Sequence, residues 1–432
     1  MTPRARIVEL DKRYLWHPYT AMGSYLAEVD PLVIARAAGV RLYDIDGRSY
    51  LDGNASWWTA VLGHAHPRLL QALSAQAAAL AHTSLAGVTH EPAARLAEEL
   101  ASVAPAGLGR VFFSDDGSTA VEVAIKLSLQ YWAQNGRPER RRFVALDGAF
   151  HGETLGATAL GGVEVFRRPF AGVLLECVHV PPLADGHERA FETLSKLLGE
   201  GADEIAAVVL EPVVQGAAGM RIYDPELVRH ARELTRRHDV FLVLDEVFSG
   251  YGRTGRMWAA EHAGVEPDLM CTAKGFSGGM LPMAATLATE RIFEGFLGEP
   301  DRAFHYGHTF CGNPLGAAVA REVLAVYRDE LIVENTASKA RVIADAFAAM
   351  RELPGVVATR SLGMIGALEL AGPSGYHERA GWRVYAEALR RGAYLRPLGN
   401  VVYVTPALNI ASSDLDELLG IVRESVAAAL RA

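Results

Sequence analysis

Several carboxylates stand at the ends of apolar segments that are typical of buried strands. Asp245 and Glu246 follow the segment 240–244, and Glu211 follows 205–210. Ligands of open α/β sheets bind beyond the carboxyl ends of the strands, so these three side chains could face a ligand. Each could equally be a solvated strand end or a helix cap, and the residue types alone favour neither interpretation.

A lone lysine, Lys274, follows the apolar segment 269–273 and precedes a glycine-rich turn. The default interpretation of a lysine at a strand end is a solvent-facing charge. Inside a cleft, burial or a neighbouring cation lowers the pKa of a lysine and favours the free amine that forms Schiff bases. The glycines of the turn would let the backbone approach a flat ligand closely.

Gly117 and Ser118 lie where a strand expected at 111–114 gives way to a helix expected at 118–134. The start of a helix offers unpaired N–H groups and the positive end of its dipole, which suit a phosphate. The two aspartates just before Gly117 are more typical of helix caps.

Phe150 follows the apolar segment 143–146 and is either a core residue or an aromatic plate for a planar ligand. Together these segments would supply a phosphate site, an aromatic plate, a carboxylate and an amine. Pyridoxal 5′-phosphate needs all four, because its phosphate, ring face, ring nitrogen and aldehyde each require one of them. The combination therefore predicts a pyridoxal phosphate site.

The elements that would position these residues alternate between short apolar strands and helices. Strands are predicted at 111–114, 143–146, 205–210, 240–244, 269–273 and 284–288. Helices are predicted at 71–82, 92–103, 118–134, 225–238 and 314–328. Because the strands are apolar throughout, this alternation predicts an α/β fold with a mostly parallel sheet that is covered on both faces.

The two ends of the chain have a different pattern. Residues 31–52 hold short strand-like segments around a turn at 46–47, and the part after 330 mixes helical patterns with short strands. We therefore predict two domains, a large one and a smaller α+β one that both termini build. Their predicted bounds are 60–330 for the large domain and 1–59 with 331–432 for the small domain.

Composition and charge limit the partners and the compartment. The net charge of −9 gives no reason to expect a nucleic-acid or anionic-membrane partner. Charged side chains interrupt the first sixteen residues, so no signal peptide is predicted and the protein is expected in the cytoplasm. Cys177, Cys271 and Cys311 fit neither a disulfide framework nor a zinc site, and we predict no metal site.

The chain resembles the class III pyridoxal-phosphate aminotransferases along nearly its whole length. The motif VLDEVFSGYGRTGR at 243–256, followed by PDLMCTAKG at 267–275, is specific to that family when both occur in this order. The resemblance implies a pyridoxal-phosphate-dependent enzyme of fold type I, whose large domain holds a mostly parallel seven-stranded sheet. It also implies a homodimer whose subunits share their active sites.

The resemblance also implies roles for single residues. Lys274 would form the Schiff base with the cofactor, and Asp245 would pair with its ring nitrogen. Gly117 and Ser118 would hold the phosphate, and Phe150 would stack on the ring. The other implied cofactor-binding residues are His308 and, from the neighbouring subunit, Thr309.

Several local motifs resemble the branch of this family that acts in biotin synthesis. They are LWHPYT at 15–20, NASWWTAVLGHAHP at 54–67 and RPLGNVVYVTP at 396–406. That branch converts 8-amino-7-oxononanoate to 7,8-diaminononanoate by ping-pong transfer through pyridoxamine phosphate. Arg396 would bind the carboxylate of this acceptor, because its planar fork forms two hydrogen bonds. The implied substrate-binding residues are Tyr19, Trp57, Trp58, Phe150, Gly307, Arg396 and Tyr403.

The chain departs from the family pattern on the side of the amino donor. Phe150 and Glu153 stand where the family has a tyrosine and an aspartate, and His308 replaces the proline between Gly307 and Thr309. The branch implies S-adenosylmethionine as the amino donor, and these replacements leave lysine open as the alternative.

Three other functions stay open. A transaminase for another ω-amine would share the cofactor residues but would not need the tryptophan pair, the WHPYT segment or Arg396. A mutase or decarboxylase can use the same fold. A non-enzymatic binding protein on this scaffold is disfavoured, because Lys274 and Asp245 are both present.

Overall fold

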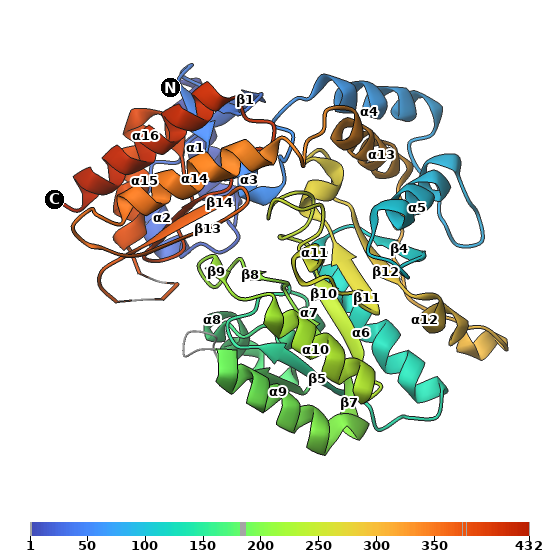
Figure 1. Cartoon of the computed structure of the whole chain (residues 1–432). Coiled ribbons are helices and arrows are strands. Elements are labelled where there is room, and N and C mark those ends of the chain that lie inside the picture. The colour runs from blue at the N-terminus through green and yellow to red at the C-terminus, as the bar shows by residue number, and fades with distance from the viewer. Residues whose placement is uncertain (1, 182–186, 374, 377, 432) are drawn as a thin grey trace.

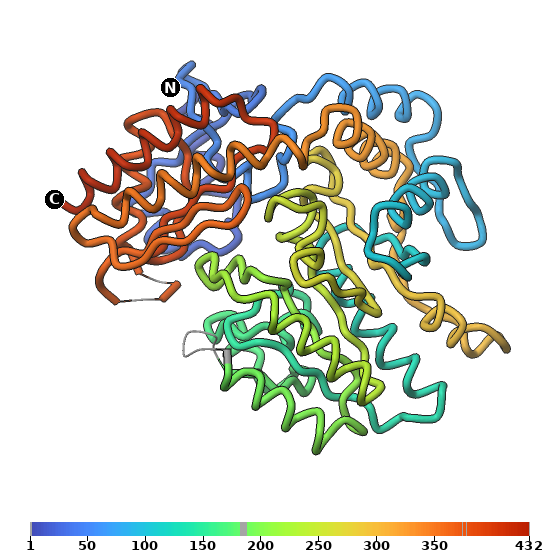
Figure 2. The backbone as a smooth tube through the Cα atoms, in the orientation of Figure 1, coloured from blue at the N-terminus to red at the C-terminus, as the bar shows by residue number. Residues whose placement is uncertain are grey.

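A computed structural model describes residues 2–181, 187–373, 375–376 and 378–431 of the chain (Figures 1 and 2). Its central sheet has the spatial order β4-β12-β11-β10-β7-β5-β6. β12 runs antiparallel to both neighbours, and the other neighbouring strands pair in parallel. The predicted α/β fold with a mostly parallel seven-stranded sheet is confirmed. The strands are β4 (Arg110–Ser114), β5 (Arg142–Leu146), β6 (Cys177–Val180), β7 (Ile205–Leu210), β10 (Phe241–Asp245), β11 (Leu269–Thr272) and β12 (Ala284–Ala288).

The inner strands of this sheet are buried on both faces. In β10, Phe241 and Val243 belong to a hydrophobic cluster with α6 (Gly117–Gln134), while Leu242 and Leu244 belong to a second cluster. Successive side chains of a strand point to opposite faces, so apolar residues are needed at every position. The helices that contribute to the second cluster include α4 (Pro67–Ala79), α5 (Glu91–Val103), α10 (Glu226–Arg237) and α13 (Pro314–Asp329).

Strands from both ends of the chain share a smaller sheet with the order β1-β2-β3-β15, and a three-stranded sheet has the order β13-β14-β16. β3 and β15 pair in parallel, and the blue N-terminal and red C-terminal parts therefore lie together in Figure 1. This is the expected α+β part, whereas its division from the large part at residues 60 and 330 stays a prediction. Its elements are α1 (Pro3–Tyr14), α2 (Met22–Glu28), β1 (Ile34–Ala38), β2 (Arg41–Asp44), β3 (Ser49–Asp52), α14 (Thr336–Met350), β13 (Val356–Leu362), β14 (Ile365–Leu370), α15 (Ala380–Arg391), β15 (Ala393–Tyr394), β16 (Val401–Val404) and α16 (Ser412–Ala429).

Two features were not predicted from the sequence. Strand β6 lies at the sheet edge, and three of its four residues are only partly buried, so it lacks the apolar run of the inner strands. The segment 182–203, for which the sequence favours no structure, holds α9 (His187–Gly201), while its residues 182–186 lie outside the described part.

Among the described residues, no helix is both long and apolar enough to cross a bilayer. The same residues contain no group of three or more histidine, cysteine or carboxylate side chains that could hold a metal ion. The three cysteines are free thiols.

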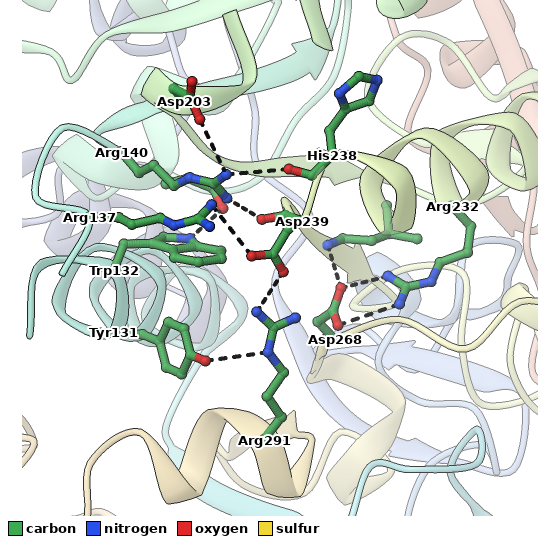
Figure 3. Close-up of polar contacts among 12 residues, drawn as sticks. Tyr131, Trp132, Arg137, Arg140, Asp203, Arg232, His238, Asp239, Asp268 and Arg291 are labelled. Atoms are coloured by element: carbon green, nitrogen blue, oxygen red, sulfur yellow. Dashed lines mark hydrogen bonds and ion pairs between the residues drawn. The ribbon is translucent and has the colours of Figure 1, made fainter. Parts of the chain in front are cut away.

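The amino end of β10 is fixed by a network of arginines and aspartates (Figure 3). Arg140, which is 1% exposed, donates to the carbonyl oxygen of Asp239, whose carboxylate accepts from Arg291 at 2.6 Å. Asp268 accepts from the Leu242 N–H at 2.8 Å and ties the start of β11 to β10. Because these contacts hold one end of the strand, its carboxyl end is placed firmly.

The hairpin between β13 and β14 rests on the loop that follows β10. Gly363 at its turn has a φ of 54°, and a Cβ there would overlap the backbone of Thr254 and Gly255. The Met364 N–H donates to the carbonyl oxygen of Arg253 at 2.9 Å. This close approach between two parts of the chain requires a glycine.

Gly363→Ala should lower the free energy of unfolding by about 3 kcal/mol or more, because both the left-handed backbone and the overlap oppose a Cβ. Gly39→Ala is the matched control, since Gly39 has the same φ of 54° but open space where the Cβ would lie. The control should lose only about 1 kcal/mol. Denaturant unfolding measures both variants, and equal losses would contradict the role of the contact.

Candidate active site

A cavity of about 450 Å³ lies at the carboxyl ends of the neighbouring strands β5, β7, β10 and β11. Because these strands are parallel, the residues that follow them meet at one edge of the sheet. Phe150, Glu211, Asp245 and Lys274 follow the four strands, and all four line the cavity. The sequence expectation that these residue types meet in one place is correct.

Asp245 is 4% exposed and is held by two hydrogen bonds. Its Oδ2 lies 2.7 Å from Nδ1 of His151, and its Oδ1 accepts from the Val247 N–H at 3.0 Å. Burial disfavours the charged imidazole, but the hydrogen bond with Asp245 outweighs it and raises the pKa of His151. No role was predicted for His151 from the sequence. Its place beside Phe150, directly after a strand end, was the available signal.

The two other carboxylates at strand ends have different roles. Glu211 lines the cavity and accepts from the N–H groups of Phe150 at 2.9 Å and Gly216 at 3.0 Å. Burial raises the pKa of Glu211 to about 7. Glu246 instead accepts from the N–H groups of Ala259 and Ala260 at the start of α11 (Ala260–Ala263), although the N-cap residue of this helix is Ala259.

Lys274 lies where β11 ends and has a φ of 49°. It is partly buried, and its Nζ lies 4.6 Å from the centre of the Trp58 ring. Burial lowers the pKa of Lys274 to about 8, although Asp245 and Glu211 act in the opposite direction. The side chain therefore faces the cavity rather than bulk solvent, and its free-amine fraction grows as the pH rises through about 8.

The start of α6 borders the cavity through Gly117 and Ser118. A Cβ on Gly117 would lie 2.7 Å from Cγ1 of Val247, so the helix can begin this close to β10 only with a glycine. Asp116 caps the helix and accepts from the Thr119 N–H at 2.8 Å, as its residue type predicts. The first N–H groups of a helix have no partner within it, and they suit an anion here.

Tyr19 and Glu153 line the cavity near Phe150. The Tyr19 hydroxyl donates to Oε1 of Glu153 at 2.9 Å, and burial raises the pKa of this carboxyl. The Glu153 N–H donates to the Ser118 hydroxyl at 3.1 Å. Through these two hydrogen bonds, Tyr19 and Glu153 connect the N-terminal segment to the start of α6.

The two tryptophans come from a turn with a strained backbone. Ala55, Ser56, Trp57 and Trp58 all have φ between 46° and 73°. This left-handed conformation costs roughly 1–2 kcal/mol for each residue that is not glycine. The side chain of Asn54 supports the turn by accepting from the Trp57 N–H at 3.1 Å.

Two residues that were predicted to line the substrate pocket, Arg396 and Tyr403, contact the two tryptophans. The guanidinium carbon of Arg396 lies 3.8 Å from the centre of the Trp57 ring, and the Tyr403 ring lies 6.3 Å from that of Trp58. Trp58 itself lines the cavity, whereas Trp57, Arg396 and Tyr403 are not among its lining residues. These three form a border beside the cavity.

The segment 307–309 lies outside this cavity. His308 approaches it most closely, with its Nε2 at 3.4 Å from Oδ1 of Asp115, which is a lining residue. Gly307 and Thr309 are exposed. The roles predicted for these residues stay predictions, because Thr309 was expected to act in a neighbouring subunit.

Pyridoxal phosphate fits the side chains around this cavity. Lys274 offers an amine of lowered pKa, and Asp245 offers a buried carboxylate. The start of α6 at Gly117 offers helix N–H groups for a phosphate. Two further carboxylates of the lining, Glu153 and Glu211, already accept hydrogen bonds from groups of the protein itself.

Comparisons with known proteins identify the family of the chain. The family model described as aminotransferase class-III matches residues 24–426. A protein from Geobacter sulfurreducens named adenosylmethionine-8-amino-7-oxononanoate aminotransferase is 40% identical, and the alignment covers 96% of each chain. A protein of the same name from Nitratidesulfovibrio vulgaris is 41% identical over 98% of this chain and 82% of its own.

Solved structures agree as well. The enzyme of that name from Methanocaldococcus jannaschii superposes with a TM-score of 0.94 at 34% identity, over 98% of this chain and 99% of its own. An omega transaminase from Pseudomonas jessenii in complex with PMP has a TM-score of 0.92 at 28% identity, over 98% of both chains. On the extent of these matches, the chain belongs to the class III aminotransferases.

Proposed function

We propose that this chain transfers an amino group to 8-amino-7-oxononanoate and so makes 7,8-diaminononanoate in biotin synthesis. We infer that pyridoxal 5′-phosphate is the cofactor and S-adenosylmethionine the amino donor. The names of the relatives from Geobacter sulfurreducens and Nitratidesulfovibrio vulgaris support both substrates.

One structural observation carries the proposal for the acceptor. The Arg396 guanidinium lies over the Trp57 ring, next to Trp58, whose ring lies under the Lys274 amine. An arginine held in this way offers its planar fork to a carboxylate. A keto acid whose carboxylate is remote from its reacting carbon suits this arrangement, and 8-amino-7-oxononanoate is such an acid.

The residues proposed to hold the cofactor are Lys274 at the aldehyde, Asp245 at the ring nitrogen, Gly117 and Ser118 at the phosphate, and Phe150 at the ring face. When bound, pyridoxal phosphate supplies an electron-accepting ring and carries the amino group between the two substrates. The contact of Asp245 with His151 keeps this carboxylate in place.

Lys274 is the proposed acid and base. In the first half of the reaction its Nζ removes a proton from Cα of the amino donor. In the second half it delivers a proton to C7 of the acceptor. The lowered pKa of about 8 suits both tasks, because a general acid–base group works best when its pKa is near the working pH. Because the first product leaves before the acceptor binds, the proposal predicts ping-pong kinetics.

We also propose a homodimer with shared active sites. Thr309 is exposed, and Phe310 beside it is 56% exposed. Leu15 and Trp16 near the N-terminus are 58% and 88% exposed. Exposed large apolar side chains favour an interface that buries them, and a second copy of this chain would provide one.

A donor panel tests the proposed function directly. With 8-amino-7-oxononanoate as acceptor, S-adenosylmethionine should support turnover at least about tenfold faster than lysine or common amino acids. Product formation measured by mass spectrometry decides the result. Faster turnover with lysine would show that lysine, and not S-adenosylmethionine, is the amino donor. No turnover with any donor would contradict 8-amino-7-oxononanoate as the acceptor.

The pKa of Lys274 predicts how cofactor uptake depends on pH. Because this pKa is lowered from 10.5 to about 8, the free-amine fraction rises as the pH rises through that value. Uptake of pyridoxal phosphate by the apoenzyme should accelerate about tenfold from pH 7 to pH 9 and then level off. Stopped-flow absorbance measures the rate.

Two variants control this pH experiment. Lys274→Ala should lack the pH-dependent step. Asp245→Asn should move its midpoint to lower pH, because the carboxylate favours the charged lysine. A rate that still rises steeply at pH 10 would show that Lys274 keeps an ordinary pKa.

Arg396→Ala should raise KM for 8-amino-7-oxononanoate by roughly 10- to 100-fold, because a charged hydrogen-bonding partner of the carboxylate is lost. The rate of the donor half-reaction, measured alone in single turnover, should stay unchanged. The KM of Arg396→Lys should lie between those of the natural protein and Arg396→Ala, since lysine keeps the charge but lacks the planar fork. Equal losses in both half-reactions would disprove the assignment.

A further inference from the structure

Asp52, Ser56 and His64 form a cluster beside the strained tryptophan turn, outside the cavity lining. Oδ2 of Asp52 accepts from the Ser56 hydroxyl at 2.7 Å and lies 2.9 Å from Nε2 of His64. Asp52 is only 3% exposed. His64 is itself fixed, because its backbone pairs with that of Gly39 through two hydrogen bonds.

This cluster does not have the geometry of a nucleophilic triad. In a triad, one ring nitrogen of the histidine faces the carboxylate and the other faces the serine. Here the same nitrogen of His64, Nε2, faces both Asp52 and Ser56, the latter at 3.5 Å. Ser56 is also absent from the cavity lining. The cluster therefore holds structure rather than a nucleophile.

The backbone that the cluster holds needs such support. Ser56 is the second of four consecutive residues in the left-handed region, and none of the four is a glycine. Its hydroxyl bond to Asp52 and the Asn54 bond to the Trp57 N–H both favour this conformation over an extended one. Trp58 has further support, because it is packed against Phe248 at 4.5 Å.

Trp57 depends on the turn more than Trp58 does. It is only partly buried, and its recorded ring partners are Tyr19 and Arg396. Asp52 is paired with Tyr394 in the parallel ladder of β3 and β15, two residues before Arg396. Asp52 therefore lies where β3 ends before Trp57, and beside the end of β15 before Arg396.

We propose that Asp52, acting through Ser56 and His64, is the positioning residue that holds Trp57 under Arg396 and so sets the affinity for the carboxylate of the acceptor. The proposal rests on the proposed function for the nature of the acceptor. Asp52 touches neither substrate, and its effect is on binding of the keto acid rather than on proton transfer at Lys274.

The test compares the two half-reactions of the holoenzyme. Asp52→Ala should raise KM for 8-amino-7-oxononanoate at least about tenfold, while the donor half-reaction changes less than about twofold. Asp52→Asn should stay within about threefold of the natural protein, because its amide oxygen can still accept from Ser56. Near-ultraviolet circular dichroism of the apoenzyme should show a weaker tryptophan signal in Asp52→Ala only.

A second substitution tests the role of backbone strain. Glycine adopts the left-handed conformation without a steric cost, so Ser56→Gly added to Asp52→Ala should recover at least about threefold of the lost affinity and part of the tryptophan signal. If Asp52→Ala does not fold, Ser56→Ala decides, since it removes only the hydroxyl. It should raise KM for the keto acid in the same direction.

The proposal is overturned if KM for the keto acid is unchanged in Asp52→Ala, or in Ser56→Ala where that variant decides. It is also overturned if both half-reactions fall by the same factor, or if the added glycine recovers nothing. Failure of the proposed function looks different, because the natural protein itself would then not use 8-amino-7-oxononanoate. In that case the tryptophan signal of the apoenzymes still decides whether Asp52 holds the turn.

Discussion

The hydrogen bond between Asp245 and His151 joins the ends of β10 and β5, across β7 between them. A buried carboxylate is stable only when it is paired, so this contact requires both strand ends to lie in register. Glu211 at the end of β7 adds a third connection, because it accepts from the Phe150 N–H. The cavity exists where these three strand ends are tied together.

The register of the sheet explains what the sequence could and could not predict. The strands were predictable because they are buried on both faces and apolar throughout. Lys274 and Asp245 were predictable because each follows such a strand. The distinction between Asp245 and Glu246 was not, since neighbouring residues leave the strand in opposite directions and only the fold decides which one faces the cavity.

The tryptophan turn was beyond prediction for a different reason. Local preference argues against a left-handed conformation at Trp57 and Trp58, because both carry a bulky side chain. Contacts fixed by the fold outweigh this preference: Asp52 belongs to β3 of the sheet that both termini build, and His64 is held by backbone hydrogen bonds with Gly39. A strained backbone conformation persists only when several contacts from the surrounding structure hold it. A sequence pattern does not show that these side chains will meet, because the folded backbone on both sides of the turn brings them together.

The two halves of the site are thus built from different parts of the fold. The central sheet places Lys274 and Asp245, while the terminal sheet places Trp57 and Arg396. On the proposed function, substitutions in the terminal sheet can change the acceptor without disturbing the residues proposed to hold the cofactor. The omega transaminase from Pseudomonas jessenii shares nearly the whole backbone of this chain, at a TM-score of 0.92 and 28% identity, so the fold is kept where most residues differ. The proposed specificity for a keto acid accordingly rests on the contact between Arg396 and Trp57.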